Sequence, residues 1–472
     1  MLSPLAKKRL TYEPPIPKIL KDLSKVTFRH EHAMAPHADI AALFPQTISG
    51  EVASAEVTET QKLGPLKIGV VFSGGPASGG HNVIAGLFDA LQKLANGSTL
   101  IGFQDGPQGI IDGEFVVITA KLLENYRNQG GFDLLGSGRV KIETDVQLQS
   151  SMAQMKKIGL DGLVIIGGDD SNTNAAVLAE YFAKHECKTR VIGVPKTIDG
   201  DLQNPYVEIS FGFDTATKTY SELIGNIARD ALSSKKYYHF IRLMGRTASH
   251  IALECALSTH PNLVLISEEK KSLSAITKEI VDLVKERAAE GKHYGVILVP
   301  EGLIESMPDI NLNMSDDIAR HLGVERDAHG NVNVSAIETE KFLIYNVKKE
   351  LGEKFAALSH FFGYEGRCGL PTNFDANYCY VLGMAAALLV ARGETSKMAF
   401  VGHLSHPPEK WTVGGVSLTA LMHLEERKGK RIPVIAKALV DLHGKAYREM
   451  QAQRAQWRLH DDYLSPGPIQ FV

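Results

Sequence analysis

Short, uninterrupted hydrophobic runs recur along the chain, and each one ends at glycine, proline or a polar loop. The clearest are KIGVVF (67–72), LVII (163–166), RVIGVP (190–195) and YGVILVP (294–300). An unbroken apolar run of this length is typical of a strand that is covered on both faces. The pattern therefore predicts buried strands that belong to parallel sheets.

A helical period appears between these runs, most clearly in AITKEIVDLVKERAAEG (275–291). Its hydrophobic residues recur on one helical face, namely Ile276, Ile280, Leu283 and Val284. Ser274 is the expected N-cap and Gly291 the expected stop. Alternating strands and helices predict an α/β fold, in which ligands bind beyond the carboxyl ends of parallel strands.

Two stretches show no sustained period. Residues 1–60 contain Pro14, Pro15 and Pro17, and we expect them to form an extension that lies on the body of the protein. Residues 307–334 are polar and irregular, which indicates an insertion or linker.

Composition narrows the possible partners. The chain has 472 residues, which suggests two or three domains, and a formal net charge of -3, which offers no electrostatic reason to bind nucleic acid or an acidic membrane surface. The four cysteines lack zinc-ligand spacing, which favours buried thiols in a reducing compartment. The longest apolar run, 381–391, is too short to span a membrane, and the start of the chain lacks the apolar core of a signal peptide. We therefore expect a cytoplasmic protein.

The first loop with chemical potential is GVVFSGGPASGGHNVIAGL (69–87), in which a strand leads through a loop with four glycines into a helix. Glycines allow a ligand to approach the backbone, and a helix N-terminus attracts anions, so a phosphate is the expected guest. The loop is not a P-loop, because His81 stands where that motif has lysine. The alternative is a glycine-rich turn without a ligand.

The second loop is GGDD, where Asp169 and Asp170 follow a predicted strand. Two carboxylates beside a polyphosphate would repel it unless a cation lies between them. Mg²⁺ meets this need, because it binds through one or two carboxylates and phosphate oxygens. The alternative for Asp170 is that it caps the next helix.

The third loop, PKTIDGD (195–201), places Lys196, Thr197, Asp199 and Asp201 together at a strand end. A lysine and two carboxylates near a phosphate loop indicate phosphoryl transfer, in which an aspartate takes a proton from a hydroxyl and a cation holds the transferred group. The alternative is a solvated surface turn.

A fourth group of loops is expected to hold the phosphoryl acceptor. Arg246 follows one predicted strand, Glu301 follows another, and FFGYEGRCGLPTNFD (361–375) contains Tyr364, Glu365 and Arg367. Arginine suits a bidentate grip on phosphate, and glutamate suits sugar hydroxyls. Singly, each of these residues is more often a surface charge or part of a structural ion pair.

Five motifs in order, GGDD, PKTIDGD, MGR, PEG and GYEGR, resemble those of phosphofructokinases, and more narrowly those of the long pyrophosphate-dependent group. The resemblance runs from about residue 60 to the terminal YLSPGPIQFV. It implies two Rossmann-like α/β domains with parallel-rich sheets and an active site in the cleft between them. The expected donor domain comprises 61–210 and 364–420, and the acceptor domain 211–363 and 421–472.

The same resemblance implies reversible transfer of a phosphoryl group from pyrophosphate to the 1-hydroxyl of fructose 6-phosphate, in glycolysis and gluconeogenesis. Asp199 would accept the hydroxyl proton, supported by Thr197 and Asp201, while Asp169 would hold Mg²⁺. Gly75 and Arg139 would bind pyrophosphate. The remaining residues of the fructose 6-phosphate site would be Met244, Gly245, Arg246, Glu301, Tyr364, Glu365, Gly366 and Arg367. Lys236 and Tyr237 would complete the site of a neighbouring subunit, which implies a homodimer or a larger assembly.

Asp170 and Lys196 are the residues that favour a pyrophosphate donor. ATP-using relatives have glycine in place of Asp170, so a carboxylate there would exclude the α-phosphate of ATP. Lys196 would neutralise the transferred group. The alternatives are an ATP-dependent phosphofructokinase, a non-catalytic regulatory subunit, which should lack the base or the metal ligand, and a nicotinamide oxidoreductase, against which the missing GxGxxG speaks. The stretch after PEG is shorter than in many long relatives.

Overall fold

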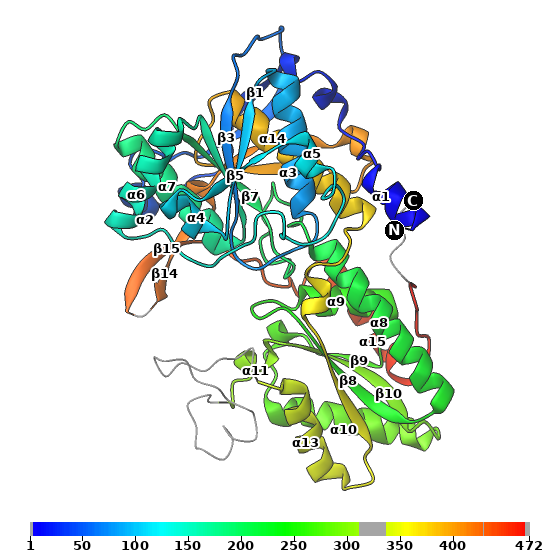
Figure 1. Ribbon diagram of the computed structural model, residues 1–472. Coiled ribbons are helices and arrows are strands. Elements are labelled where there is room, and N and C mark those ends of the chain that lie inside the picture. Colours follow the sequence, from blue (N-terminus) through cyan, green and yellow to red (C-terminus); the bar gives the residue numbers. More distant parts are fainter. Residues whose placement is uncertain (1–2, 311–336, 428, 468–472) are drawn as a thin grey trace.

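The computed structural model describes residues 3–310, 337–427 and 429–467, so most of the expected insertion at 307–334 lies outside the described residues. The chain forms two α/β bodies, one larger than the other, that face each other across their loops (Figure 1). This is the architecture that the alternation of strands and helices predicts.

The larger body is built on a sheet that has nine strands within the described residues. In spatial order these are β1 (Val26–His32), β2 (Glu51–Val57), β13 (Thr412–Ser417), β12 (Lys397–Gly402), β7 (Arg190–Pro195), β6 (Gly162–Gly167), β3 (Lys67–Phe72), β4 (Thr99–Phe103) and β5 (Phe115–Ile118). The central strands β12, β7, β6, β3 and β4 run parallel to one another. Each strand outside this group pairs antiparallel with its neighbours. The loops after β3, β6 and β7 therefore emerge side by side at one edge.

The smaller body has a parallel sheet, whose strands within the described residues are β11 (Ala357–Phe362), β8 (Tyr237–Leu243), β10 (Tyr294–Pro300) and β9 (Leu263–Val264), in that spatial order. The strands predicted at 67–72, 190–195 and 294–300 coincide with β3, β7 and β10, and 163–166 lies within β6. The hydrophobic runs located these strands correctly because both faces of each are buried.

The helices of the larger body are α3 (Gly80–Leu94), α4 (Pro107–Asp112), α5 (Ala120–Leu123), α6 (Asp145–Ile158), α7 (Asp169–Lys184) and α14 (Asn373–Ala391). Those of the smaller body are α8 (Phe213–Ser234), α9 (His250–Thr259), α10 (Leu273–Ala289), α11 (Leu303–Ser306), α13 (Thr339–Leu351) and α15 (Lys445–Leu459). The helix predicted at 275–291 is α10, but its N-cap is Ser272 and not Ser274. The Ser272 hydroxyl accepts a hydrogen bond from the backbone N–H of Ala275 at 3.1 Å.

Helix α14 packs along α3 in the larger body. It is long and apolar enough to cross a membrane by composition, yet 89% of its most apolar window is buried inside the protein, as in a core helix. A side chain at Gly86 or Gly383 would collide with the backbone of the other helix, at Tyr380 or Val83 respectively. The two glycines therefore let the helices pack backbone to backbone.

Two parts of the chain do not follow the predicted domain boundaries. The N-terminal 60 residues are more than an extension, because β1 and β2 pair antiparallel with each other and β2 pairs with β13 of the large sheet. The hairpin β14 (Met422–Arg427) and β15 (Lys430–Ile435) packs on α2 (Ala38–Leu43) and α7, so residues 422–435 lie with the larger body. After the hairpin, α15 and the residues that follow it join the smaller body. There α15 packs on α9 and α10, and the Leu464 N–H donates to the Thr259 carbonyl at 3.0 Å.

The Asp375 carboxylate joins α14 of the larger body to the start of α8. It accepts hydrogen bonds from the backbone N–H groups of Gly212 at 3.1 Å and Thr215 at 2.9 Å. The N-terminus of α8 is thus capped from another part of the chain, which fixes how this helix leaves the larger body.

Candidate functional site

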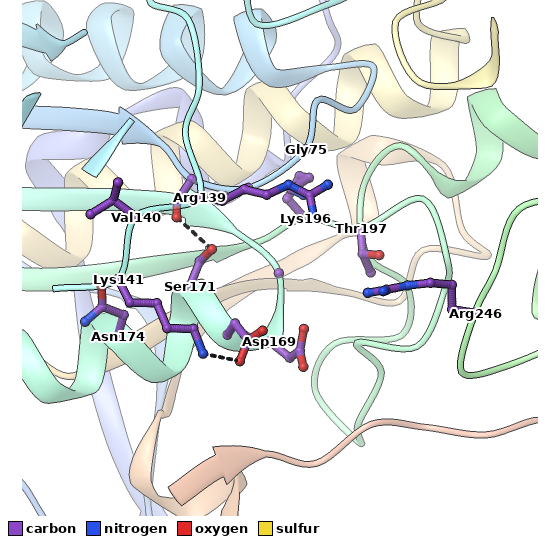
Figure 2. Close-up of a pocket in the computed structure, with 14 residues that line it drawn as sticks. Gly75, Arg139, Val140, Lys141, Asp169, Ser171, Asn174, Lys196, Thr197 and Arg246 are labelled. Carbon is purple, nitrogen blue, oxygen red and sulfur yellow. Dashed lines mark hydrogen bonds and ion pairs between the residues drawn. The ribbon is translucent and has the colours of Figure 1, made fainter. Parts of the chain in front are cut away.

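Three loops at the carboxyl ends of β3, β6 and β7 are locked together by hydrogen bonds. The Ser171 hydroxyl donates to that of Ser73 at 2.8 Å (Figure 2), and the Lys196 backbone N–H donates to the Gly167 carbonyl at 2.9 Å. The Gly74 N–H donates to the carbonyl of Gly138 at 2.9 Å, which brings the loop that carries Arg139 to the same edge. The loops that the sequence marked separately therefore form one site.

The site has two connected compartments. The first has a volume of about 220 Å³ and lies over the three loops. The second has a volume of about 530 Å³ and lies between the two bodies. The residues that line both compartments are Gly75, Arg139, Lys196, Thr197 and Arg246. Figure 2 shows Arg246 reaching toward Thr197 from the smaller body. A group at this junction can pass from a guest in one compartment to a guest in the other.

The glycines of the first loop divide into two pairs. Gly74 and Gly75 line the first compartment, and a side chain at Gly75 would collide with the guanidinium of Arg367. Gly79 and Gly80 instead lie in the helix start, where a side chain would collide with Cys379 or Phe132. Only the first pair is placed to bring backbone near a ligand, and the second pair serves packing.

Lys196 lies at the junction and is 7% exposed. Burial lowers the pKa of its ammonium to about 8, with Asp199 opposing this shift and Arg367 and Arg139 adding to it. Burying an ammonium close to two guanidinium groups is unfavourable unless an anion binds among them. The position of Lys196 therefore suits a phosphoryl group.

Asp199 lies in the second compartment, and the Thr197 hydroxyl accepts a hydrogen bond from its backbone N–H at 3.1 Å. Burial and the nearby carboxylates of Asp201 and Glu301 raise the pKa of Asp199 to about 6. A carboxylate with a pKa near neutrality is better suited to accept a proton than one with an ordinary pKa.

Asp169 and Asp170 are the first two residues of α7, and both line the first compartment. The N-cap of the helix is Gly168 and no side chain caps it, so the alternative that Asp170 is the cap is wrong. The two carboxylates instead face different cations. Lys141 Nζ lies 3.1 Å from Asp170 Oδ1, and Lys437 Nζ lies 3.5 Å from Asp169 Oδ2.

Asp201 does not line either compartment. It is 5% exposed, and its Oδ2 atom also lies 3.5 Å from Lys437 Nζ. Burial alone would lower the pKa of Lys437, but Asp169, Asp201 and Asp199 outweigh it and hold the pKa above its ordinary value. Asp169 and Asp201 thus converge on one cation.

This convergence shows that the residues present fit a hard divalent cation such as Mg²⁺, because two carboxylate oxygens from different loops point to one position. Within the described ranges, the structure has no group of three or more histidine, cysteine or acidic side chains that could hold a metal. An ion bound at Asp169 would therefore take its other ligands from water and from phosphate oxygens, as Mg²⁺ does.

The remaining residues that were predicted to bind the acceptor fall into two sets. Those that line the second compartment are Met244, Arg246, Glu301, Tyr364 and Arg367. Gly245, Glu365 and Gly366 support them from behind. Gly245 has a φ of +116° in the turn before Arg246, Glu365 accepts a hydrogen bond from the Gly363 N–H at 3.0 Å, and Gly366 packs against the ring of Tyr220.

Comparison with known proteins agrees with this geometry. The phosphofructokinase family model matches residues 67–390. The chain belongs to the phosphofructokinase family. It is 49% identical to the pyrophosphate–fructose 6-phosphate 1-phosphotransferase subunit beta 2 of Arabidopsis thaliana, over 98% of this chain and 90% of the relative. It is 45% identical to the enzyme of that name from Entamoeba histolytica, over 100% of this chain and 96% of the relative.

Solved structures confirm the predicted phosphofructokinase fold. The structure of a pyrophosphate-dependent phosphofructokinase from Nitrosospira multiformis aligns with a TM-score of 0.63, at 18% identity, over 86% of this chain and 95% of the other. The predicted family resemblance, made from five motifs, is likewise confirmed.

Two predicted residues of this phosphofructokinase lie away from its own site. Lys236 and Tyr237 stand at the amino end of β8, whereas Met244 and Arg246 follow its carboxyl end. A strand of this length separates them by about 20 Å, since each residue adds about 3.3 Å. Both side chains are exposed, and neither lines either compartment.

The motifs did not identify two cations of the phosphofructokinase site. Lys141 follows the Arg139 loop, and Lys437 follows the β14–β15 hairpin. Neither lies in a recognisable motif. Lys141 had a weak signal, because it is two residues from Arg139, whereas Lys437 had none.

Proposed function

We propose that this chain is a reversible phosphotransferase that moves a phosphoryl group from pyrophosphate to the 1-hydroxyl of fructose 6-phosphate, in glycolysis and gluconeogenesis. The observation that carries the proposal is the junction at Lys196, where a small compartment flanked by Asp169 and Asp170 opens into a larger one lined by arginines and Asp199. The names of relatives at 44–49% identity support it.

The first compartment is proposed to bind pyrophosphate. The Gly75 backbone, Arg139 and Lys196 surround the position with donors and positive charge. Asp170 narrows the same compartment with a carboxylate that would repel the α-phosphate of a nucleotide. Pyrophosphate is compatible with both the positive groups and the Asp170 carboxylate, because it has no third phosphate that would reach the carboxylate.

The second compartment is proposed to bind fructose 6-phosphate. Arg246 and Arg367 offer guanidinium groups to phosphate oxygens, and Glu301 can accept hydrogen bonds from sugar hydroxyls. Met244 and Tyr364 supply apolar surface for the sugar ring. The acceptor hydroxyl would thereby face the Lys196 junction.

Asp199 is proposed to take the proton from the 1-hydroxyl as that oxygen attacks the terminal phosphorus of the donor. Thr197 positions Asp199 through its backbone N–H. Lys196, and Arg139 beside it, hold the negative charge of the group in transfer. Asp169, with Asp201 behind it, would hold Mg²⁺, which when bound neutralises donor oxygens. Phosphate chemistry is similar on both sides, so the reaction is expected to run in either direction.

We also propose that the enzyme acts as a homodimer or larger assembly in the cytoplasm. The exposed Lys236 and Tyr237 lie away from the compartments of their own chain, which supports a role for them in the site of a neighbouring subunit. Relatives from plants are named as subunits, which agrees with an assembly.

A coupled assay of the purified chain with Mg²⁺ and fructose 6-phosphate tests the proposal by comparing pyrophosphate with ATP. We expect turnover with pyrophosphate and a rate at least about 100-fold lower with ATP, which corresponds to about 2.7 kcal/mol of discrimination. Equal rates with both donors would favour an ATP-using enzyme. No turnover with either, in a folded chain that binds fructose 6-phosphate, would favour a regulatory subunit. The matched control is Asp199→Asn, which should lose turnover but keep sugar phosphate binding.

A further inference from the structure

The segment between the β14–β15 hairpin and α15 carries the chain from the larger body back to the smaller one. It is held to loops of the site by its backbone. The Ala438 N–H donates to the carbonyl of Asp201 at 2.7 Å, and the Ala438 carbonyl lies 3.0 Å from His250 Nε2. The Val440 N–H donates to Glu268 at 2.9 Å. These contacts fix the backbone of Lys437 at the edge of the site.

The Lys437 ammonium lies among oxygens from three other loops. Its Nζ atom is 3.5 Å from Asp169 Oδ2, 3.5 Å from Asp201 Oδ2 and 3.3 Å from Thr247 Oγ1. The side chain is only 27% exposed. The two carboxylates belong to different loops and do not share an element, so the lysine joins them as a metal ion would.

Two cations cannot occupy this position together. An ammonium and a divalent ion at one position would repel each other strongly, because a largely buried site screens charge much less than water does. The ammonium of a lysine is carried on a flexible four-carbon stem, so it can move while the backbone of Lys437 keeps its position. Entry of a metal at Asp169 therefore requires that Lys437 turn away.

We propose that Lys437 is an internal counter-ion that occupies the metal position between Asp169 and Asp201 and is displaced when the metal enters. The metal alone then binds weakly, because it must break two ion pairs. It binds well only together with pyrophosphate, whose oxygens supply new partners for both cations. The proposal deepens the proposed function, since it rests on Asp169 as the metal ligand.

Binding of Mn²⁺ alone, followed by electron paramagnetic resonance in the full chain without substrates, tests this directly. We expect Lys437→Met to bind Mn²⁺ at least about tenfold more tightly than the native chain, which is a change of about 1.4 kcal/mol. Lys437→Arg keeps the positive charge and is expected to bind Mn²⁺ as weakly as the native chain. Asp169→Asn in the Lys437→Met background should remove the gain.

The matched control is Lys141→Met, which removes the lysine that pairs with the neighbouring acid, Asp170. If general loss of positive charge were the cause, both variants would tighten Mn²⁺ binding equally, and the proposal would be overturned. Unchanged or weaker binding in Lys437→Met would also overturn it.

Thermal unfolding provides a second readout that does not depend on activity. Lys437→Met leaves two carboxylates close together, so without metal its midpoint should fall, and Mn²⁺ should raise it by more than it raises the native midpoint. A variant that is stable without metal and indifferent to Mn²⁺ would contradict the proposal. Neither measurement uses a phosphoryl donor, so both outcomes are independent of whether the enzyme uses pyrophosphate.

Discussion

Lys141 Nζ lies 3.1 Å from Asp170 Oδ1 at the edge of the first compartment. Both side chains are about half exposed, so the pair contributes little to stability. The lysine instead fixes the position of the carboxylate. Under the proposed function, that position is where the α-phosphate of a nucleotide would lie, so the pair would help to select the donor.

Asp170→Gly is expected to weaken the use of pyrophosphate and to admit ATP. Removing the carboxylate removes both its volume and its charge, and a few kcal/mol of repulsion corresponds to a change of about 100-fold or more. Steady-state kcat/KM with each donor measures the change. An unaltered ratio of the two would mean that Asp170 does not select the donor.

The control for this variant is Lys141→Met, which leaves Asp170 in place but removes its partner. We expect it to keep the preference for pyrophosphate, with a smaller loss of selectivity than Asp170→Gly. ATP use as high as in Asp170→Gly would show that the lysine, and not the carboxylate, sets the preference.

Asp199→Asn is expected to lower kcat by about 100-fold to 10,000-fold, the usual range for loss of a positioned base. The asparagine is similar in size, so KM for fructose 6-phosphate should change little. Thr197→Val, which removes the hydroxyl that accepts from the Asp199 N–H, should give a smaller fall. Stopped-flow rates and sugar phosphate binding separate the two effects. A kcat within a few-fold of the native value would exclude Asp199 as the base.

The residues that sequence reasoning located correctly share a physical reason. Buried strands produce unbroken apolar runs, and parallel strands place their following loops at one edge, so Asp169, Lys196 and Asp199 were predicted to meet. The glycines after β3 indicated a loop that a ligand can approach. Gly74 and Gly75 fit this prediction, whereas Gly79 and Gly80 allow close packing at the start of the helix.

The residues that it missed depend on contacts between distant segments. Lys437 reaches Asp169 only because the β14–β15 hairpin packs on α2 and α7, which no local pattern encodes. The strands β1 and β2 are only partly buried and contain polar residues, so they lack the continuous apolar signal of central strands. Edge strands and single charges are set by tertiary packing, and a one-chain pattern does not reveal them.

Gly75→Ala tests whether close packing of the donor loop against Arg367 matters. The backbone of Gly75 has no positive φ, so alanine costs little strain, but its methyl group would displace the Arg367 guanidinium. We expect a rise of about tenfold in KM for fructose 6-phosphate with an almost unchanged unfolding midpoint. Gly64→Ala, where a methyl group meets open space, is the control and should change neither. An unchanged KM in Gly75→Ala would show that Arg367 adapts without loss.

The proposed sharing of sites between subunits predicts that two inactive variants complement each other. Lys236→Ala and Asp199→Asn should each be nearly inactive. A dimer of the first variant lacks the lysine that each subunit supplies to its partner's site, and a dimer of the second lacks the base in every site. After mixing and reassembly, one site in each mixed dimer has both residues, so about a quarter of native activity should return. Activity no higher than the sum of the separate variants, with mixed dimers shown to form, would place Lys236 outside the site.

The His239 and His360 pair predicts how stability depends on pH. His239 Nδ1 lies 2.9 Å from His360 Nε2, so one ring donates and the other accepts, and the contact fails when both rings are protonated. Burial, and then His360, lowers the pKa of His239 to about 4 against the opposing effect of Asp230, and burial also lowers the pKa of His360.

The unfolded chain binds a proton at His239 below about pH 6.5, while the folded chain does not until about pH 4. Stability is therefore complete above pH 6.5 and is lost as the pH falls toward 4. Thermal midpoints measured across this window should decline, and His239→Gln, whose amide can still donate to His360, should decline less steeply. Exposed His443 is the control, because His443→Gln should leave the slope unchanged. Equal slopes in the native chain and His239→Gln would mean that other groups govern acid stability.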